Sequence, residues 1–402
     1  MRIFYVCRRI PFPPDRGDKI AAFNTIRHLA RRHEVHVFCL GDGKEDLANI
    51  PGLRECAKSV TTAPVSGLTI KLRALRALFT GAPLSVAALN EAALHRAIRS
   101  KSTELRPDLV IVYSCNMAQF AEALADAPRI MHFGDLDSLK WQMYADRSGP
   151  SLRWVYALEA RRLLDYERRI ARGFSHALVH TEGEKRDFER LIPGIPVTTV
   201  GNGVDLDYFR SAGAAKRPAS MVFTGVMNYR PNIDAVVWFC DEILPIVQAA
   251  IPEANFTICG SRPAKAVRRL AERRGVTVTG WVPDARPYLD RAEIFVAPLR
   301  MARGVQNKLL EALAMGLPCV VSQAALRGTT VADGDGVIAA DDPRDFVRHL
   351  VDLLRDGTRR QEMAGRARAA AEANYRWEAQ LARLDEVIAT VSADPRRASA
   401  GG

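Results

Sequence analysis

The chain has 402 residues, which is long enough for two domains, and 48% of them are hydrophobic while 26% are charged. This composition excludes an intrinsically disordered chain, and no run of about 20 apolar residues predicts a membrane-spanning helix. The 57 basic and 46 acidic residues leave a formal net charge of +11, which favours anionic partners such as a phosphate-rich substrate, nucleic acid or an anionic membrane surface.

The N-terminal segment Met1–Pro14 begins with a short apolar run that arginines follow at once, without a small-residue cleavage site. We interpret the run as a first β-strand rather than a signal peptide and expect a cytoplasmic protein. The seven cysteines form no CxxC pair with the spacing of a zinc or redox site, which indicates reduced thiols in the same compartment.

Short apolar runs alternate with segments of helical periodicity along the whole chain, which is typical of parallel α/β architecture. The strands expected in the first half are Arg2–Cys7, Val35–Leu40, Leu109–Tyr113, Arg129–Phe133, His176–Thr181 and Val197–Val200. Those expected in the second half are Met221–Gly225, Asn255–Gly260, Val276–Thr279, Glu293–Ala297 and Pro318–Ser322. The expected helices include Lys19–Arg32, Leu152–Ala171, Ile233–Ala250, Pro263–Arg274, Asn307–Met315 and Pro343–Arg355. The last of these starts with Asp342 as N-cap and proline at the first helical position.

A domain boundary is expected at residues 201–218, where NGVD is followed by the small, loop-like stretch SAGAAKRPAS and a new strand. We therefore expect an N-terminal Rossmann-like domain at 1–200, a linker at 201–218 and a C-terminal Rossmann-like domain at 219–375. A helix at 376–391 is expected to pack back toward the N-terminal domain. The small, polar residues 392–402 are expected to be disordered.

Two well-known phosphate-binding loops are missing from the sequence. No GxGxxG follows a strand and no GxxxxGK[ST] occurs, which argues against a dehydrogenase and against a P-loop NTPase. A doubly wound sheet still binds its ligands beyond the carboxyl ends of the strands. The segments that follow the strands are therefore where we expect the site.

The segment Ala297–Met315 offers the richest set of candidate residues. A strand ends at Pro298, a loop containing Gly304 follows, and the helix that then begins would bind an anion at its N-terminus. Lys308 and Glu311 are three residues apart and share one helix face, where lysine suits a diphosphate and a carboxylate suits sugar hydroxyls. The alternative is a surface helix with an ordinary ion pair.

The order strand, glycine loop and K-x-x-E-A-x-A-x-G-x-P in this segment resembles the donor site of the large retaining glycosyltransferase family that includes sucrose-phosphate synthases and bacterial mannosyltransferases. This is the glycosyltransferase family 4-like group with the GT-B fold. The resemblance continues in NGVDLDYF at Asn202–Phe209, FTGVMNYRPNIDA at Phe223–Ala235 and GWVPDARPYLDRAEIFVAPL at Gly280–Leu299. The segments PFPPDRGDKIAAFNTIRHLA and DLDSLKWQMYA more narrowly resemble sugar transferases of exosortase-associated exopolysaccharide clusters.

The resemblance implies two Rossmann-like domains with parallel sheets facing across a cleft, the first on the acceptor side and the second holding the donor. It implies a hexosyltransferase that uses a nucleoside-diphosphate sugar, retains the anomeric configuration and acts on a saccharide or lipid-linked acceptor in exopolysaccharide or glycolipid synthesis. No cofactor or metal is expected besides the donor, and no nucleic acid.

By the same resemblance, Lys308 and Arg230 stabilise the departing diphosphate and Glu311 holds the ribose. The other donor-binding positions that it implies are Gly225, Asn232, Trp281, Val282, Arg303, Gly304 and Val305. Arg303 departs from the family, which often has a glutamate there, eight residues before Glu311. That departure puts the donor sugar in doubt. The alternative for Arg230 is a solvated surface arginine without a role in binding, and the alternative for Trp281 is a side chain that only packs against its neighbours.

In the first half, Gly17 and Asp18 lie in DRGDK between the first strand and the first helix, and the resemblance places Gly17 close to the donor phosphates. An ordinary tight turn is the alternative. Asp135 and Asp137 form a DxD sequence, which we do not interpret as a metal site because it follows a strand in the acceptor half. Asp135 and the nearby His132 are the expected catalytic groups of this half, and Asp137 either binds substrate or caps a helix.

Leu68, Leu72, Leu75 and Phe79 recur at helical spacing with Lys71, Arg73 and Arg76 between them. This pattern predicts an amphipathic basic helix, which either lies on the inner face of an anionic membrane or packs its apolar stripe into the N-terminal domain.

Three other functions remain compatible with the sequence. A catalytically inactive GT-B scaffold is favoured by Arg303, while Lys308 and Glu311 weigh against it. A GT-B epimerase would act on the sugar nucleotide without an acceptor. A nucleic-acid-binding protein would explain the charge, but no recognised reader motif is present.

Overall fold

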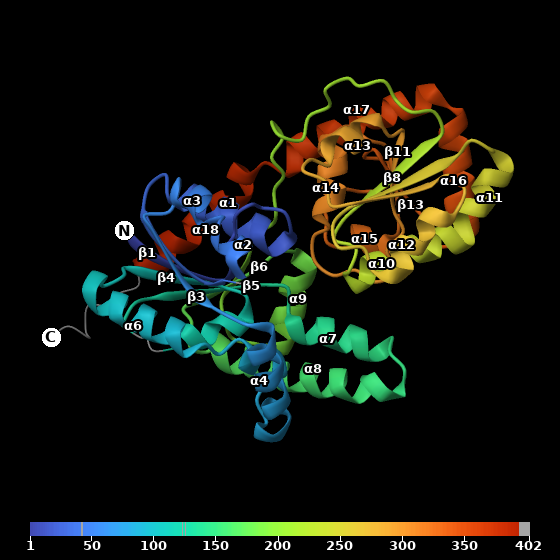
Figure 1. The fold of residues 1–402 in the computed structure, drawn as a ribbon. Coiled ribbons are helices and arrows are strands. Elements are labelled where there is room, and N and C mark those ends of the chain that lie inside the picture. The colour runs from blue at the N-terminus through green and yellow to red at the C-terminus, as the bar shows by residue number, and fades with distance from the viewer. Residues whose placement is uncertain (42, 123, 125, 394–402) are drawn as a thin grey trace. The chain divides into compact units, whose positions relative to one another are not determined.

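The computed structural model describes residues 1–393 except 42, 123 and 125. The expected disordered tail at 392–402 therefore lies, from residue 394 onward, outside the described residues. The chain divides into two compact units, each with its own sheet (Figure 1). Unit 1 comprises Met1–Gly201 and the segment that starts at Gln380, and unit 2 comprises Asn202–Ala379. No helix among the described residues is both long and apolar enough to cross a membrane.

Unit 1 has a parallel seven-stranded sheet with the strand order β3-β2-β1-β4-β5-β6-β7. The strands are β1 (Arg2–Arg9), β2 (Glu34–Gly41), β3 (Ser59–Pro64), β4 (Leu109–Tyr113), β5 (Arg129–Gly134), β6 (His176–Val179) and β7 (Val197–Thr199). All five residues of β4 are buried, as expected of a central strand covered on both faces. The sequence did not predict β3, because this edge strand buries only Ala63 and reads as polar.

Helices cover both faces of this sheet (Figure 1). On one face lie α4 (Gly67–Thr80), α5 (Leu84–Ala88), α6 (Ala92–Leu105) and α8 (Pro150–Ala171). On the other face lie α1 (Gly17–Leu29) and the C-terminal α18 (Trp377–Ser392). The two helices are joined by the imidazole of His28, which lies 3.0 Å from the carboxylate of Asp385. The remaining helical segments are α2 (Gly43–Leu47), α3 (Ile50–Arg54), η1 (Cys115–Phe120), α7 (Asp137–Asp146) and α9 (Glu182–Leu191).

Unit 2 has a parallel six-stranded sheet with the order β10-β9-β8-β11-β12-β13. Its strands are β8 (Ser220–Thr224), β9 (Asn255–Cys259), β10 (Val276–Gly280), β11 (Ile294–Ala297), β12 (Cys319–Val321) and β13 (Val337–Ala339). Its longer helices are α10 (Arg230–Trp238), α11 (Leu244–Ala250), α14 (Asn307–Ala314), α16 (Pro343–Arg355) and α17 (Gly357–Asn374). The shorter ones are α12 (Lys265–Arg269), η3 (Leu270–Glu272), α13 (Arg286–Arg291) and α15 (Gln323–Leu326).

The segment Ile233–Ala250, expected as one helix, is helical throughout but is not one regular α-helix. A π-helical turn, η2 (Phe239–Ile243), separates α10 from α11, and Pro245 lies in the first turn of α11. Proline has no N–H to donate to the preceding turn, so the helix must change its hydrogen-bond pattern there. The helix Pro343–Arg355 was predicted with its correct bounds, and the Asp342 side chain caps it by accepting from the Arg344 N–H at 2.7 Å.

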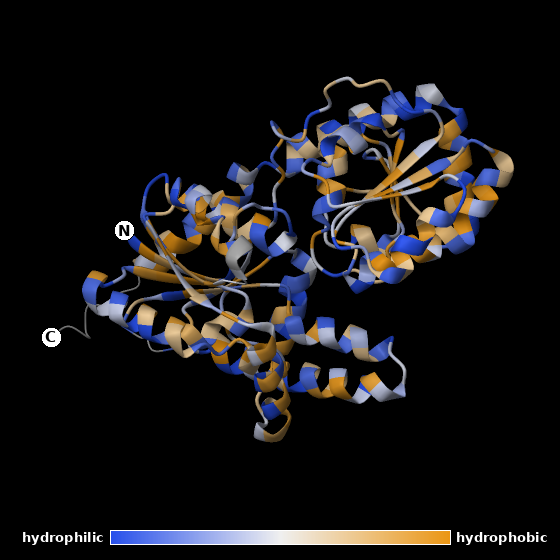
Figure 2. Ribbon diagram, viewed as in Figure 1, coloured by the Kyte–Doolittle hydropathy of each residue, from blue (hydrophilic) through white to orange (hydrophobic). Residues whose placement is uncertain are grey.

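Each unit has its own apolar core, centred on the strands that Figure 2 colours as hydrophobic. Two parallel α/β units confirm the predicted fold class. Because parallel strands of one sheet all end at the same edge, the carboxyl ends of β8, β9, β10 and β11 bring four loops of unit 2 together.

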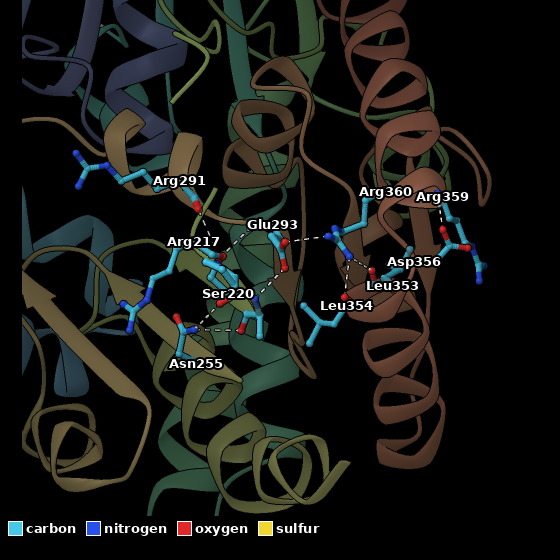
Figure 3. Close-up of polar contacts among 12 residues, drawn as sticks. Arg217, Ser220, Asn255, Arg291, Glu293, Leu353, Leu354, Asp356, Arg359 and Arg360 are labelled. Atoms are coloured by element: carbon cyan, nitrogen blue, oxygen red, sulfur yellow. Dashed lines mark hydrogen bonds and ion pairs between the residues drawn. The ribbon is translucent and has the colours of Figure 1, made fainter. Parts of the chain in front are cut away.

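A polar network lies at the opposite, amino-terminal edge of the same sheet (Figure 3). The Glu293 carboxylate, before β11, accepts from the Ala219 N–H at 3.0 Å and pairs with Arg360 at 2.9 Å. Arg360 also donates to the carbonyls of Leu353 and Leu354 at the end of α16. The network thereby joins α16 and α17 to the start of the sheet, and we assign it to stability because it lies away from the ligand-binding edge.

Candidate active site

The first feature of the site in unit 2 is a close approach of backbone at the ends of β8 and β9. A Cβ on Gly260 would lie 1.6 Å from the carbonyl oxygen of Gly225. A Cβ on Gly225 would lie 2.7 Å from the Asn232 Nδ2 and 3.2 Å from the Lys308 Nζ. Only glycine fits at either position, and the two glycines leave room for the side chains of α10 and α14 to meet above β8.

Lys308 and Asn232 form the centre of the site. The Lys308 ammonium donates to the Asn232 Oδ1, and the Asn232 Nδ2 donates to the Val226 carbonyl at 2.9 Å. The bond to Val226 fixes the amide orientation and so keeps the oxygen turned toward the lysine. The ammonium also lies 4.3 Å from the centre of the Phe223 ring. Asn232 is buried, and its role was implied only by the family resemblance.

The charges of Lys308 and Glu311 are poorly solvated, although part of each side chain remains accessible. Burial lowers the pKa of Lys308 to about 7, an effect that Glu311 opposes. Burial likewise raises the pKa of Glu311 to about 7, an effect that Lys308 opposes. In the described part of the chain the ammonium binds Asn232 instead of forming the ordinary surface ion pair with Glu311. A poorly solvated cation is what a multiply charged anion would stabilise.

The loop before α14 is tightly constrained. Gly304 has a φ of 63°, and a Cβ on Gly328 would lie 2.0 Å from the Gly304 carbonyl oxygen. The Gln306 side chain donates to the Arg303 carbonyl at 3.1 Å. Asn307, the first residue of α14, accepts from the Asn202 Nδ2 at 2.9 Å. We did not single out Asn202 or Asn307 from the sequence, although Asn202 begins the NGVD motif.

The other residues predicted for unit 2 lie on loops and helix ends at the same edge of its sheet. Arg230 is the first residue of α10 and is half-buried. Trp281 follows β10 and is 73% exposed, so it is not a packing residue, and Val282 beside it is half-buried. Arg303 and Val305 are half-buried in the loop before α14, where Val305 packs against the core. The structure thus brings Gly225, Asn232 and Lys308 into contact, and the other predicted residues of unit 2 follow strands that end at the same edge of its sheet.

In unit 1, three buried rings gather where β4, β5 and β6 end. His180 Nδ1 lies 3.1 Å from the Val200 carbonyl, which can only accept, so Nδ1 carries the proton. His180 Nε2 is then the acceptor for the Tyr113 hydroxyl at 3.1 Å. The His132 ring lies 4.9 Å from the Tyr113 ring and 4.8 Å from the His180 ring, between centroids. Burial and His180 together hold the pKa of His132 well below its usual range.

His132 is 2% exposed, and within the described chain its Nε2 has no hydrogen-bond partner. Asp135 is half-buried just beyond Gly134, whose φ of 71° turns the chain away from β5. The two hydrogen bonds of His180 give it a structural role, whereas the Nε2 of His132 is unused among the described residues.

Asp137 is the first residue of α7, and Leu136 is the N-cap, so the capping role considered for Asp137 is wrong. Its carboxylate accepts from Lys140 one turn later and from the Cys115 thiol at 3.4 Å. Burial alone would raise the pKa of Asp137, but Lys140 brings it below its usual value. At the start of the same helix, the Ser138 N–H donates to the carboxylate of Glu167 at 3.2 Å, and the Ser138 hydroxyl donates to it as well. Glu167 is buried and was not predicted from the sequence.

The glycine of DRGDK begins α1 and is exposed, while Asp18 pairs with Arg9. Lys19 is buried and lies 3.4 Å from Asp46. The carboxylate of Asp18 is therefore held by its own unit. Across the described residues, no group of three or more His, Cys, Asp or Glu side chains is arranged to hold a metal ion.

Comparisons with known proteins cover both units. Residues 20–203 match the family described as glycosyl transferase 4-like domain, and residues 218–356 match the family described as glycosyl transferases group 1. A GDP-mannose-dependent monoacylated alpha-(1-6)-phosphatidylinositol monomannoside mannosyltransferase of Corynebacterium glutamicum is 32% identical over 211 residues, which are 46% of this chain and 54% of that protein. A phosphatidyl-myo-inositol mannosyltransferase of Propionibacterium freudenreichii is 25% identical over 170 residues, covering 40% and 42%. The chain thus spans about half the length of the curated relatives it matches.

Among solved structures, sucrose-phosphate synthase from Thermosynechococcus elongatus superimposes with a TM-score of 0.72 at 16% identity, over 97% of this chain and 99% of that one. Anabaena HepE in complex with UDP superimposes with a TM-score of 0.68 at 12% identity, over 97% and 100%. At these identities the likeness is one of fold.

Proposed function

Because the chain belongs to the GT4-like glycosyltransferases with the GT-B fold, we propose that it transfers a glycosyl group from a nucleoside-diphosphate sugar to an acceptor hydroxyl. The observation that carries this proposal is the Lys308–Asn232 pair at the carboxyl end of β8, where a poorly solvated ammonium stands beside a helix N-terminus. Both features favour an anion such as a diphosphate.

In the proposed reaction the bond between the anomeric carbon and the diphosphate oxygen breaks, and its electron pair stays on the diphosphate. The acceptor oxygen bonds to the anomeric carbon and loses its proton. Lys308, Arg230 and the N-terminus of α14 stabilise the charge that develops on the departing diphosphate. Glu311 accepts hydrogen bonds from the ribose hydroxyls. We propose retention of the anomeric configuration on the family resemblance alone, and we include no metal or other cofactor.

We assign Asp135 and His132 to the acceptor side of the reaction. Since the pKa of His132 lies well below neutrality, the ring is an uncharged hydrogen-bonding group there and not a cation. Its unused Nε2 is the atom we assign to this role. We assign the acceptor proton to Asp135, which is half-buried just beyond the end of β5.

The names of similar proteins provide candidates for the donor and for the acceptor. GDP-mannose is named for one of them and UDP for a structural neighbour, so both nucleotides are candidates here. Two relatives are named for phosphatidylinositol-based acceptors, which supports a lipid-linked acceptor and a role in glycolipid or exopolysaccharide synthesis. A protein that meets such an acceptor would work at the inner face of a membrane.

The deciding experiment is calorimetric titration with GDP, UDP, ADP and their sugar conjugates, followed by product analysis. We expect one nucleotide diphosphate to bind, and Lys308→Ala to weaken that binding at least about tenfold. No binding by any of them would overturn the proposal. Binding without turnover would indicate the inactive scaffold, and conversion of the donor sugar without an acceptor would indicate an epimerase. The anomeric proton of the product, observed by NMR, tests retention.

A further inference from the structure

Helix α4 of unit 1 carries an apolar stripe on its outer surface. Leu68, Leu72, Leu75 and Phe79 are 70%, 53%, 56% and 87% exposed. At about 100° per residue, these four side chains fall within about 60° of arc, which is a single narrow face of the helix. The alternative in which the stripe packs into the N-terminal domain is therefore wrong.

The opposite face holds α4 in place. Ala77 is buried and Ile70 packs against the core of unit 1. The Arg162 guanidinium on α8 donates to the carbonyls of Ala77 at 2.9 Å and Leu78 at 3.1 Å, which satisfies the last turn of α4. The Ser66 side chain caps the first turn by accepting from the Thr69 N–H. The helix is anchored at both ends, so the exposed stripe belongs to an ordered element.

The charges beside the stripe are of one sign. Lys71 and Arg76 are exposed and lie on opposite sides of the stripe, each about 70° from its centre at the same helical angle per residue. The third basic residue, Arg73, pairs with Glu91 at 2.9 Å on the inner side. The helix contains no Asp or Glu. Long basic side chains that flank an apolar face can extend their charges toward phosphate groups while the apolar groups enter the hydrocarbon boundary.

A second exposed apolar segment lies at the start of α8, on the same side of the sheet as α4 (Figure 1). Leu152 and Trp154 are 51% and 58% exposed there, with the exposed Arg153 between them. Figure 2 shows α4 and this end of α8 as mixtures of hydrophobic and hydrophilic residues. Tryptophan is favoured at the boundary between hydrocarbon and water, because its ring is apolar and its N–H is a donor.

We propose that the stripe of α4, flanked by Lys71 and Arg76, is a docking surface for an anionic lipid bilayer, with Trp154 as a second contact. The surface deepens the proposed function, since it would bring a lipid-linked acceptor to unit 1. It stands on the exposure and charge of α4, which are independent of the donor site in unit 2.

The test is flotation of the full chain with vesicles of phosphatidylcholine alone and of phosphatidylcholine with phosphatidylglycerol in equal parts. We expect the anionic vesicles to be bound at least about tenfold more tightly, with the difference shrinking as salt is raised from about 0.1 to 0.5 M. The double variant Leu72→Ser with Phe79→Ser should reduce binding at least about tenfold. Its control is Ile246→Ser, which removes a 50% exposed apolar side chain from α11.

A second pair of variants separates charge from apolar contact. Lys71→Gln with Arg76→Gln should weaken binding to anionic vesicles only, whereas Lys265→Gln with Arg269→Gln, an exposed basic pair on α12, should leave it unchanged. Equal binding to both vesicle types, or unchanged binding by the Leu72 and Phe79 variant, would overturn the proposal. So would a dimer, detected by light scattering, that this variant dissociates, because the stripe would then bind a second copy.

Nucleotide binding by the same variants distinguishes this proposal from the proposed function. A variant that still gains thermal stability from the nucleotide is folded, so its loss of vesicle binding concerns the docking surface alone. Vesicle binding without any nucleotide binding would leave the docking surface in place and remove the assigned donor site.

Discussion

The Lys308 ammonium donates to the side-chain oxygen of Asn232, a residue 76 positions earlier in the chain, close to Gly225, the glycine that follows β8. The pair joins α10 to α14 in front of the sheet. The Lys308 ammonium is poorly solvated by water, and a bound anion would stabilise its charge.

Glu311→Gln should weaken donor use strongly and leave the fold intact. The amide keeps the size of the side chain but loses the charge that strengthens hydrogen bonds from the ribose hydroxyls. We expect kcat/KM for the donor to fall at least about tenfold, while the melting temperature does not fall, because the carboxyl is poorly solvated. Steady-state kinetics and thermal unfolding measure the two effects. An unchanged kcat/KM would remove Glu311 from the site.

Donor binding should take up a proton above pH 7. The pKa of Lys308 is lowered to about 7 in the free protein, and a bound diphosphate favours the charged ammonium and raises that pKa again. Calorimetry at pH 8 in buffers of different ionisation enthalpy should therefore show proton uptake, and affinity should fall between pH 7 and 9. In Lys308→Met the uptake should vanish. If it persists there, another group binds the proton.

The same lysine should lower the stability of the free protein. Its pKa is about 7 when folded and near 10.4 when unfolded, so the unfolded chain binds more protons between these values and stability rises with pH across that window. The cost is fully present below pH 7. Lys308→Met should accordingly raise the melting temperature at pH 6 by a few degrees and by less at pH 10. A melting temperature below that of the wild type at pH 6 would contradict this account.

Three glycines should respond very differently to alanine. Gly260→Ala would place a methyl group against the Gly225 backbone, which cannot move without breaking the sheet edge, and should cost at least about 2 kcal/mol. Gly225→Ala meets the ends of the Asn232 and Lys308 side chains and should weaken donor binding. Gly365→Ala is the control in α17, with nothing within 4 Å, and should stabilise by about 0.5–1 kcal/mol. Denaturant unfolding and nucleotide titration rank the three, and equal effects would refute the assignment.

Arg303→Glu should change donor preference more than stability. An arginine at this position attracts a sugar carboxylate through paired hydrogen bonds, and a glutamate would repel it. Arg300→Glu is the matched change in the same loop, where the side chain pairs with Asp234 and lies over Trp238, so it should lower the melting temperature instead. A donor panel run on both variants decides the matter. If the Arg303→Glu variant uses the donors in the same order of preference as the wild type, residue 303 does not recognise the donor sugar.

Local patterns in the sequence determined the elements and their order. Central strands such as Leu109–Tyr113 are uninterrupted apolar runs because helices cover both of their faces, and Asp342 with Pro343 marked the start of α16 because capping is a local interaction. The positions of Lys308 and Glu311 on one face of a helix at the end of a strand were predictable for the same reason. Edge strand β3 was not, since an edge need not be apolar.

Tertiary structure alone decided what each of these side chains contacts. Helical periodicity places Leu68 and Phe79 on one face of α4 but does not say whether that face turns inward. The exposure of both side chains and the burial of Ala77 on the other side show that it turns outward. Lys308 meets Asn232 because β8 and β11 are neighbours in the sheet. The lowered pKa of His132 likewise comes from burial inside the folded unit and from His180, which follows another strand. Burial and charge depend on neighbours distant in sequence, and periodicity along a single segment does not contain them.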